Sequence, residues 1–338
     1  MRSPGVETGL HKRGTRFFEI HRSRERFSAK RRARPVISAA ATHGRRDDGH
    51  AQEHGQNLDR PRSVAAPAVN FLLMSIPHRL KCAETWAGNE GASSAADLPG
   101  LTVWVHSTPS GAGDAGGDVH YVSVCPSCIV SRIALADVSG HGRAVVALGV
   151  TLRELMETYL TELEQTSLMR DLNEAVISEL DGVHYATMVA VGFHGRRGLL
   201  VMTNAGHPPA FWYRAHRNEW AWFEAHGAEK SSGVSGTPLG LLPNVSYERM
   251  IVKPEPGDLI VLYSDGVSEA TNPDDKELGR DGLMTMAQAL DTTSAERFGA
   301  QLVDAVREFR GGRVPDDDET IIVVQRSQAL STDGPREA

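Results

Sequence analysis

Cysteine is scarce in this chain: only Cys82, Cys125 and Cys128 occur among 338 residues. Small secreted domains held together by disulfides need more, so the composition fits a reducing compartment and predicts a cytoplasmic protein. Cys125 and Cys128 have C-x-x-C spacing, but no second C-x-x-C or H-x3-H pair supplies the remaining ligands of a zinc site. We interpret the pair as two thiols on a hairpin turn, with an accessory metal or redox role as the alternative.

The sequence also lacks a long apolar run. The longest stretch, 64–74, is about half of the ~20 residues that a membrane-spanning helix needs, and it contains Pro67 and Asn70. It lies too far from the first residue to act as a signal peptide. We therefore expect no membrane span.

Three signatures of other catalytic chemistries are absent. The sequence has no Cys-x5-Arg cradle of the kind that cysteine-based phosphatases use, no G-x-x-x-x-G-K-[ST] loop for nucleotide phosphates, and no G-x-S-x-G nucleophile elbow. Because no side-chain nucleophile is evident, a water activated by metal ions becomes the natural attacking group.

Charge is distributed unevenly along the chain. Residues 1–62 carry 15 Lys and Arg against 7 Asp and Glu, so the remaining residues hold a net charge of −15. An acidic body argues against a nucleic-acid-binding core, and we expect no nucleic-acid partner for the folded domain.

The basic N-terminal segment shows no sustained periodicity and contains too little apolar surface to offset its ordering entropy, so we expect it to be disordered. Two alternatives stay open: contact with nucleic acid or an acidic membrane, and a wrongly assigned start, with Met74 as the native first residue. The predicted organisation is an extension over 1–73, a folded domain over 74–326 and a flexible tail over 327–338.

The folded domain is predicted to contain many strands and paired helices. Apolar residues spaced three or four apart, or polar and turn residues at the boundaries, predict helices over 143–165, 168–180, 281–290 and 294–309. Runs rich in β-branched and aromatic residues predict strands over 101–106, 120–124, 129–136, 185–193, 199–204, 210–213, 219–223, 247–252, 258–263 and 320–324. This pattern indicates sheets covered by helices, an α+β layered architecture.

Four aspartates lie where a predicted strand meets a turn. They are Asp118 in GGD, Asp137 in ADVSGHG, Asp265 in YSDGVSEA and Asp317 in DDDET. Taken singly, each has an ordinary alternative, such as an Asx turn, a helix cap or a solvated loop. Taken together, carboxylates at strand ends, with glycines that leave space beside them, predict a site for hard cations such as Mg2+ or Mn2+. That chemistry points to metal-dependent hydrolysis.

The ordered set of motifs carries a family resemblance. GGD, ADVSGHG with a following helix, TNAGHPPAFWYR, GTPLGL, GDLIVLYSDGVSEA and DDET extend from about residue 100 to residue 326. As a set they resemble the PPM family of metal-dependent serine/threonine phosphatases of type 2C, in its bacterial SpoIIE/RsbU-like branch. The resemblance implies a four-layer αββα sandwich, in which a central antiparallel β-sandwich is flanked by helix pairs.

The resemblance also implies a site with two Mn2+ or Mg2+ ions. Asp118 and Asp137 would bind the second metal, and Asp137 would bridge both. Val138 would contribute its backbone carbonyl. Asp265 and Asp317 would hold the first metal.

Other residues of the motifs are assigned by the same resemblance. The family pattern in the last motif selects Asp317 and leaves Asp318 outside the first ligand sphere. A water that bridges the two ions would attack phosphorus, and His141 is the nearest candidate general acid for the leaving alkoxide. His207 in NAGHPP is expected to support a hairpin beside the site. The arginine that holds phosphate in eukaryotic members has no clear counterpart here.

The expected activity is hydrolysis of phosphoserine or phosphothreonine on a protein substrate in bacterial signalling. In this branch of the family, typical substrates are small phosphorylated regulators such as anti-sigma-factor antagonists in partner switching. Two alternatives stay open: a catalytically silent binding module on the same fold, which the loss of a metal aspartate would mark, and a hydrolase of small phosphoesters.

Overall fold

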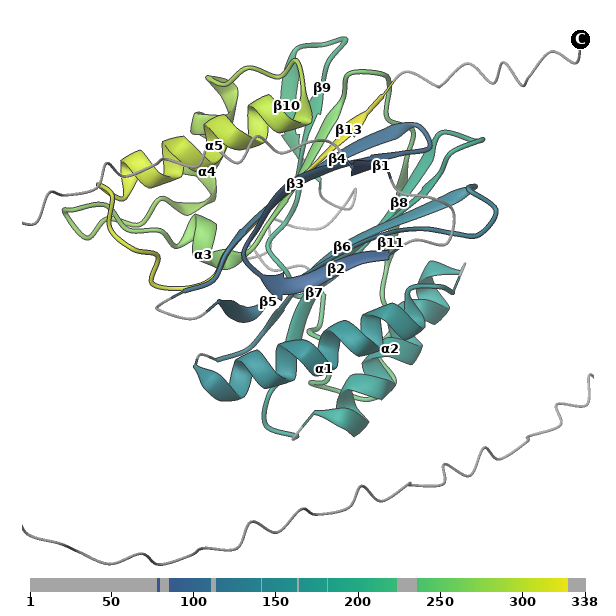
Figure 1. Cartoon of the computed structure of the whole chain (residues 1–338). Helices are drawn as coiled ribbons and strands as arrows, with labels where there is room; N and C mark the ends of the chain where they lie inside the picture. The colour runs from purple at the N-terminus through teal and green to yellow at the C-terminus, as the bar shows by residue number, and fades with distance from the viewer. Residues whose placement is uncertain are drawn as a thin grey trace, which may run out of the picture. The chain divides into compact units, whose positions relative to one another are not determined.

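The computed structural model describes residues 78–79, 85–110, 114–140, 142–162, 164–180, 182–223 and 236–327. The predicted N-terminal extension and nearly all of the predicted tail lie outside these residues, as does His141. Two β-sheets stack face to face, and helices cover both outer faces (Figure 1). The predicted α+β sandwich of four layers is confirmed.

The first sheet has seven strands within the described residues, in the order β1-β3-β4-β13-β12-β9-β10. Their bounds are His78–Arg79 for β1, Ala92–Leu98 for β3, Leu101–Thr108 for β4, Glu319–Arg326 for β13, Leu259–Tyr263 for β12, Phe211–Arg214 for β9 and Glu219–Trp222 for β10. Neighbouring strands run antiparallel, except that β1 and β3 are parallel.

The second sheet has six strands in the same part of the chain, in the order β11-β8-β7-β6-β5-β2, all antiparallel to their neighbours. Their bounds are Arg249–Val252 for β11, Leu199–Ala205 for β8, Ala186–His194 for β7, Val130–Val138 for β6, Ala115–Val124 for β5 and Thr85–Glu90 for β2. The predicted hairpins β7–β8 and β9–β10 are both present.

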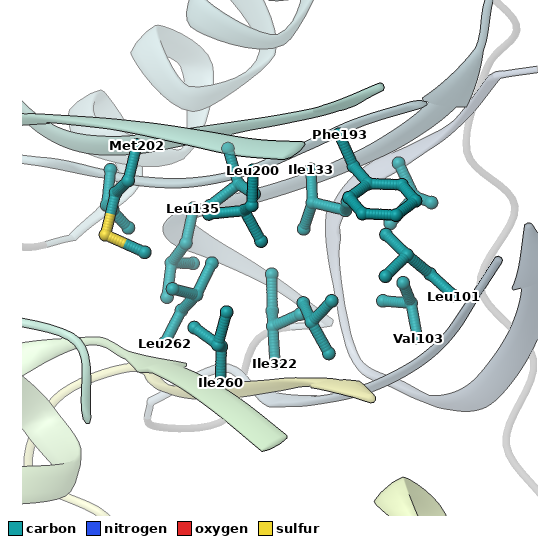
Figure 2. Close-up of a cluster of buried hydrophobic side chains, with 14 of the residues drawn as sticks. Leu101, Val103, Ile133, Leu135, Phe193, Leu200, Met202, Ile260, Leu262 and Ile322 are labelled. Atoms are coloured by element: carbon teal, nitrogen blue, oxygen red, sulfur yellow. The ribbon is translucent and has the colours of Figure 1, made fainter. Parts of the chain in front are cut away.

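A hydrophobic core fills the space between the sheets (Figure 2). Successive residues of a strand point to opposite faces, so every second residue of β6 enters this core, beginning with Ile133 and Leu135. The next position with the same orientation is Asp137. The alternation that builds the core therefore also delivers a carboxylate to its end.

Helices form the two outer layers (Figure 1). Helices α1 (Arg143–Tyr159) and α2 (Gln165–Glu179) pack on the six-stranded sheet through a second apolar cluster. Helices α4 (Gly279–Gln288) and α5 (Ala295–Phe309) cover the seven-stranded sheet through a third. A single turn of helix, α3 (Asp265–Ser268), follows β12. No helix in the described ranges is long and apolar enough to cross a membrane.

The structure corrects the predicted boundary between the first two helices. The helix predicted over 143–165 ends at Tyr159, and a second helix begins at Gln165. The carboxylate of Glu164 accepts hydrogen bonds from the backbone N–H groups of Thr166 and Ser167, which caps the second helix. This cap places the start of the second helix at Gln165, three residues before its predicted start at residue 168.

Four regular elements of the described chain were missed from the sequence: β1, β2, β3 and α3. The sequences TWAGNE and ASSAADL contain few large β-branched residues, so neither has the usual composition of a strand. Strand β3 instead buries the small side chains of Ala95 and Ala96. Tertiary packing thus decides the conformation of these two segments.

Candidate metal centre

Asp118 and Asp137 face each other across two neighbouring strands at one end of the sandwich. They are directly paired in the β5–β6 ladder, and both occupy positions that point toward the other sheet. Asp118 is only 3% exposed, and neither of its carboxylate oxygens has a hydrogen-bond partner among the described residues. A buried acid without partners is costly unless a proton or a cation neutralises it.

The electrostatics of Asp118 reflect this setting. Burial, followed by the charge of Asp137, raises the pKa of Asp118 well above its usual range. The nearby hydroxyls of Thr320 and Ser264, which belong to the other sheet, lower the pKa in part. Asp118 therefore lies at the junction between the two sheets.

Asp137 connects this pair to the other two predicted aspartates. Burial, followed by the charges of Asp265 and Asp317, raises the pKa of Asp137 to about 8. The pKa of Asp265 is raised in turn by its burial and by the charge of Asp317. The structure thus brings the four aspartates from the sequence motifs into one electrostatically coupled group, although they come from separate segments of the chain.

The chemistry of these residues fits divalent cations. As the side chains are placed, no three His, Cys, Asp or Glu residues in the described ranges are arranged to ligate a metal ion. The donor set is nevertheless the one that Mg2+ and Mn2+ prefer, namely carboxylate and backbone carbonyl oxygens. The two unpartnered oxygens of Asp118 and the mutual repulsion within the group fit a cation, which would remove both costs.

The two glycines of GGD are explained by close contacts on either side of β5. A Cβ atom on Gly116 would overlap the carboxyl group of Asp318, whereas one on Gly117 would lie 2.6 Å from Cγ1 of Val145 in α1. The side chain of Asn89 donates a hydrogen bond of 3.2 Å to the carbonyl of Gly116. The start of β5 is therefore held between helix α1 and the other sheet.

The loop after Asp137 leads directly into α1. Val138 is the last residue of β6, and Ser139 exchanges two hydrogen bonds with Tyr185, of 2.9 Å and 3.0 Å. Gly140 and Gly142 have φ values of +106° and +89°, which favour glycine. His141 lies between them, outside the described residues, so its role as a general acid stays a prediction.

His207 lies beside this site on a tightly held loop. The side chain of Asn204 accepts a hydrogen bond of 2.8 Å from the backbone N–H of His207 and donates one of 2.9 Å to the carbonyl of His207. The imidazole is fully buried and its Nδ1 lies 2.8 Å from Oγ1 of Thr187, the residue paired with Asp137. Burial lowers the pKa of His207 to about 3, so the ring is neutral near pH 7.

Glu269 is a neighbour of the site that was not predicted from the sequence. Its pKa is raised by burial and by the charge of Asp265, and it helps to raise the pKa of Asp137. The spacing of four residues from Asp265 was the available signal, since it places two side chains on one side of a helical turn. Asn89 gave no comparable signal, because its contacts are with segments distant in sequence.

The C-x-x-C segment lies away from these aspartates. It forms the predicted turn after β5, where the N–H of Cys128 donates a hydrogen bond of 2.8 Å to the carbonyl of Cys125. The prediction of two thiols is wrong, because Cys128 is disulfide-bonded and Cys125 is the free cysteine of this pair. Asp118 lies near the start of the same strand, so the length of β5 separates the two features.

Known proteins resemble this chain in sequence. The family model described as Stage II sporulation protein E (SpoIIE) matches residues 131–327. The phosphoserine phosphatase RsbU of Bacillus subtilis (strain 168) is 26% identical over 196 residues, which are 58% of this chain and 55% of RsbU. The phosphoserine phosphatase RsbP of the same strain is 24% identical over 144 residues, 41% of this chain and 33% of RsbP. The matched region spans about half of RsbU and less of RsbP.

Solved structures share the fold. The PP2C phosphatase domain of SpoIIE from Bacillus subtilis, with a fragment of its regulatory domain, has a TM-score of 0.55 at 18% identity and covers 73% of this chain and 64% of that one. The RsbU and RsbW domains of Rv1364c from Mycobacterium tuberculosis have a TM-score of 0.56 at 19% identity, with coverages of 69% and 62%. RsbX in complex with magnesium has a TM-score of 0.51 at 16% identity, with coverages of 70% and 100%.

Proposed function

We propose a function on one premise: the chain belongs to the SpoIIE family, whose model matches more than half of its residues. The proposed activity is metal-dependent hydrolysis of phosphoserine or phosphothreonine on a protein substrate, in bacterial signalling. The observation that carries it is the buried, unpartnered carboxylate of Asp118 beside Asp137, within a group of four coupled aspartates. The names of RsbU and RsbP as phosphoserine phosphatases support the same chemistry.

The family resemblance divides the proposed ligands between two ion positions. Asp118, Asp137 and the backbone carbonyl of Val138 would hold one ion, and Asp265 and Asp317, together with Asp137, would hold the other. Bound Mn2+ or Mg2+ would activate a water and screen the charge that develops on the phosphoryl oxygens. The solved complex of RsbX with magnesium supports a divalent cation on this fold.

The protein itself holds the proposed ligands in fixed positions. Asp137 is anchored by the β5–β6 and β6–β7 ladders, so its carboxylate is held between the two sheets before any ligand binds. The left-handed glycines after it let the chain turn directly from β6 into α1. Preorganised charges of this kind cost no reorganisation during the reaction.

The proposed substrate class is a small phosphorylated regulatory protein, of the type of an anti-sigma-factor antagonist. Support comes from the similarity to RsbU and from the solved chain that joins RsbU and RsbW domains. Activity on a folded phosphoprotein should exceed activity on free phosphoserine, because only the protein contacts surfaces outside the aspartate cluster.

The test is phosphate release from a phosphoserine peptide and from free phosphoserine, with Mn2+ and with excess EDTA. We expect turnover of the peptide that requires Mn2+ and that falls to the EDTA background in Asp137→Ala and in Asp265→Asn. Circular dichroism should show that both variants stay folded, since removing one acid relieves repulsion within the cluster. Wild-type turnover in either variant, or turnover that EDTA leaves intact, would refute the proposed site.

A further inference from the structure

Asp318 is a buried acid that the family resemblance leaves outside the metal ligands. It is 7% exposed, and its carboxylate accepts hydrogen bonds from three backbone N–H groups. Oδ1 accepts from Ser110 at 2.6 Å, and Oδ2 accepts from Gly117 at 2.5 Å and from Asp118 at 3.3 Å. Both oxygens thus accept hydrogen bonds from the backbone, and one of these donors is the N–H of Asp118 itself.

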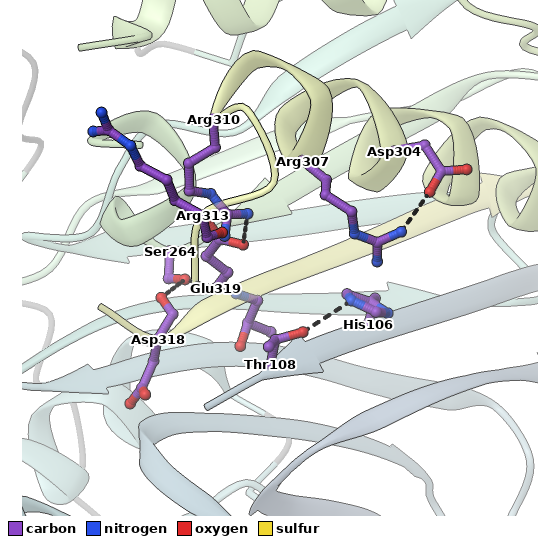
Figure 3. A network of polar contacts seen from close by, with 10 residues as sticks. His106, Thr108, Ser264, Asp304, Arg307, Arg310, Arg313, Asp318 and Glu319 are labelled. Carbon is purple, nitrogen blue, oxygen red and sulfur yellow. Dashed lines mark hydrogen bonds and ion pairs between the residues drawn. The ribbon is translucent and has the colours of Figure 1, made fainter. Parts of the chain in front are cut away.

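The backbone of Asp318 makes a second connection, to the segment that carries Asp265. Its carbonyl accepts a hydrogen bond of 3.1 Å from the hydroxyl of Ser264 (Figure 3). The same hydroxyl accepts one of 2.9 Å from the N–H of Thr320. Gly266 passes so close that a Cβ atom there would overlap the Asp318 carbonyl.

These contacts make Asp318 a junction of three motifs. Its side chain reaches GGD at the start of β5, its carbonyl reaches SDG at the end of β12, and its N–H donates a hydrogen bond of 2.8 Å to Oδ1 of Asp317. Strand β5 belongs to the six-stranded sheet, whereas β12 and β13 belong to the seven-stranded sheet. Asp318 therefore links the two sheets at the end where the aspartates converge.

We propose that Asp318 is a positioning residue, which sets the distance between Asp118 on one sheet and Asp265 and Asp317 on the other. The proposal rests on the proposed function, since it assigns a residue to the same metal site. Apart from the nearby hydroxyls of Thr320 and Ser264, nothing in the described chain holds the carboxylate of Asp118, so its position depends mainly on its backbone. Asp318 fixes that backbone. Hydrogen bonds from N–H groups to an ionised carboxylate are stronger than neutral ones, which suits this task.

The test replaces the acceptor without changing the shape of the side chain. Asp318→Asn introduces an NH2 donor that faces backbone N–H donors, so at least one of the three hydrogen bonds is lost. Groups that orient metal ligands typically change metal affinity 10- to 100-fold when mutated, and we expect the Kd for Mn2+ to rise by about that factor. In the metal-free protein, amide hydrogen exchange at Gly117 and Asp118 should accelerate.

The chain offers a matched control in the same loop. Asp316 is exposed and lies two residues earlier, so Asp316→Asn removes the same charge without touching β5. This variant should keep the wild-type Kd for Mn2+ and the wild-type exchange rates at both amides. If Asp318→Asn does not fold, Ser264→Ala breaks the other arm of the junction and should also weaken Mn2+ binding, by a smaller factor.

The outcomes separate this proposal from the proposed function. Unchanged amide exchange in Asp318→Asn would overturn it, even if Mn2+ binding weakened, because charge removal alone would then be the cause. Wild-type Mn2+ affinity in Asp318→Asn would overturn it as well. A wild-type protein that binds Mn2+ but releases no phosphate would refute the proposed activity while leaving both measurements of the junction valid.

Discussion

The two ends of the β5–β6 hairpin each bury a charged side chain, and the two side chains differ in whether they have hydrogen-bond partners. At the end away from the aspartates, the guanidinium of Arg132 donates to the side chain of Gln165 and, at 2.6 Å, to the carbonyl of Glu162. Gln165 in turn donates a hydrogen bond of 2.8 Å to the carbonyl of Ala190. At the other end, both oxygens of the buried carboxylate of Asp118 lack a partner in the described chain.

This contrast separates a structural charge from a functional one. The hydrogen bonds of Arg132 are completed within the protein, where they attach the α1–α2 connection to the sheet. The carboxylate of Asp118 has no such hydrogen bonds. The end of the hairpin that carries it is therefore stable only when a proton or an external cation neutralises the charge. Strained or unsatisfied groups of this kind concentrate at functional sites, because the protein maintains them for a ligand.

The largest expected effect concerns the completed end. Arg132→Ala leaves the Gln165 amide oxygen and the Glu162 carbonyl without their donor, and it opens a cavity beneath the helix connection. We expect the free energy of unfolding to fall by about 3 kcal/mol, as measured by urea denaturation. The Kd for Mn2+ should not change, because the aspartates lie at the opposite end of the hairpin.

Arg132→Met is the matched variant, since an apolar side chain of similar length fills the space without a buried charge. It should recover part of the lost stability. A large loss of Mn2+ affinity in Arg132→Ala would break the comparison, because the two ends would then not be independent.

A smaller effect of opposite sign is expected at the unpartnered end. The folded-state pKa of Asp118 is raised above its unfolded value, so at pH 7 ionisation of this group costs the metal-free protein stability. Asp118→Asn should therefore raise the melting temperature of the metal-free protein, by an amount equivalent to about 1–2 kcal/mol. Saturating Mn2+ should stabilise the wild type and not the variant.

Calorimetric melting in EDTA and in Mn2+ measures both effects. A metal-free Asp118→Asn variant that melts below the wild type would mean that this carboxylate is already satisfied within the fold. The stabilising role that the contrast assigns to the cation would then be wrong.

The smallest effect concerns His207, whose folded-state pKa of about 3 lies below its ordinary value of 6.5. As the pH falls below 6.5, the unfolded chain takes up a proton that the folded protein does not, so the stability that this group confers is lost progressively toward pH 3. Between pH 7 and pH 5.5 the loss is about 1 kcal/mol. His207→Gln should remove this part of the pH dependence in urea denaturation curves, and an unchanged pH slope would contradict it.

The sequence predicted those elements whose side chains follow a clear period. Apolar spacing identified α5, with only its first residue misplaced, and buried strands such as β6 and β12. It failed for β2 and β3, where small residues and tertiary packing replace β-branched side chains. The boundary at Tyr159 required knowledge of the Glu164 cap, which apolar spacing does not register.

At the site, the four aspartates were predictable because each marks a strand end beside characteristic neighbours. The function of Asp318 was not, since three adjacent acids look alike in the sequence. Its carboxylate contacts the backbone of Gly117 and Asp118, which lie about 200 positions earlier in the chain. Only the folded chain therefore distinguishes Asp318 from Asp316. The assignment of the four motif aspartates as metal ligands stays a prediction.

Binding of Mn2+ and phosphate release, measured on the same samples, test the central claim most directly. Wild-type protein and Asp265→Asn would be titrated with Mn2+ by calorimetry, while phosphate release from a phosphoserine peptide is followed at each metal concentration. The account predicts two bound Mn2+ ions in the wild type, turnover that rises with their occupancy, and loss of both an ion and turnover in the variant. Turnover without bound Mn2+, or an Asp265→Asn variant that matches the wild type, would contradict it.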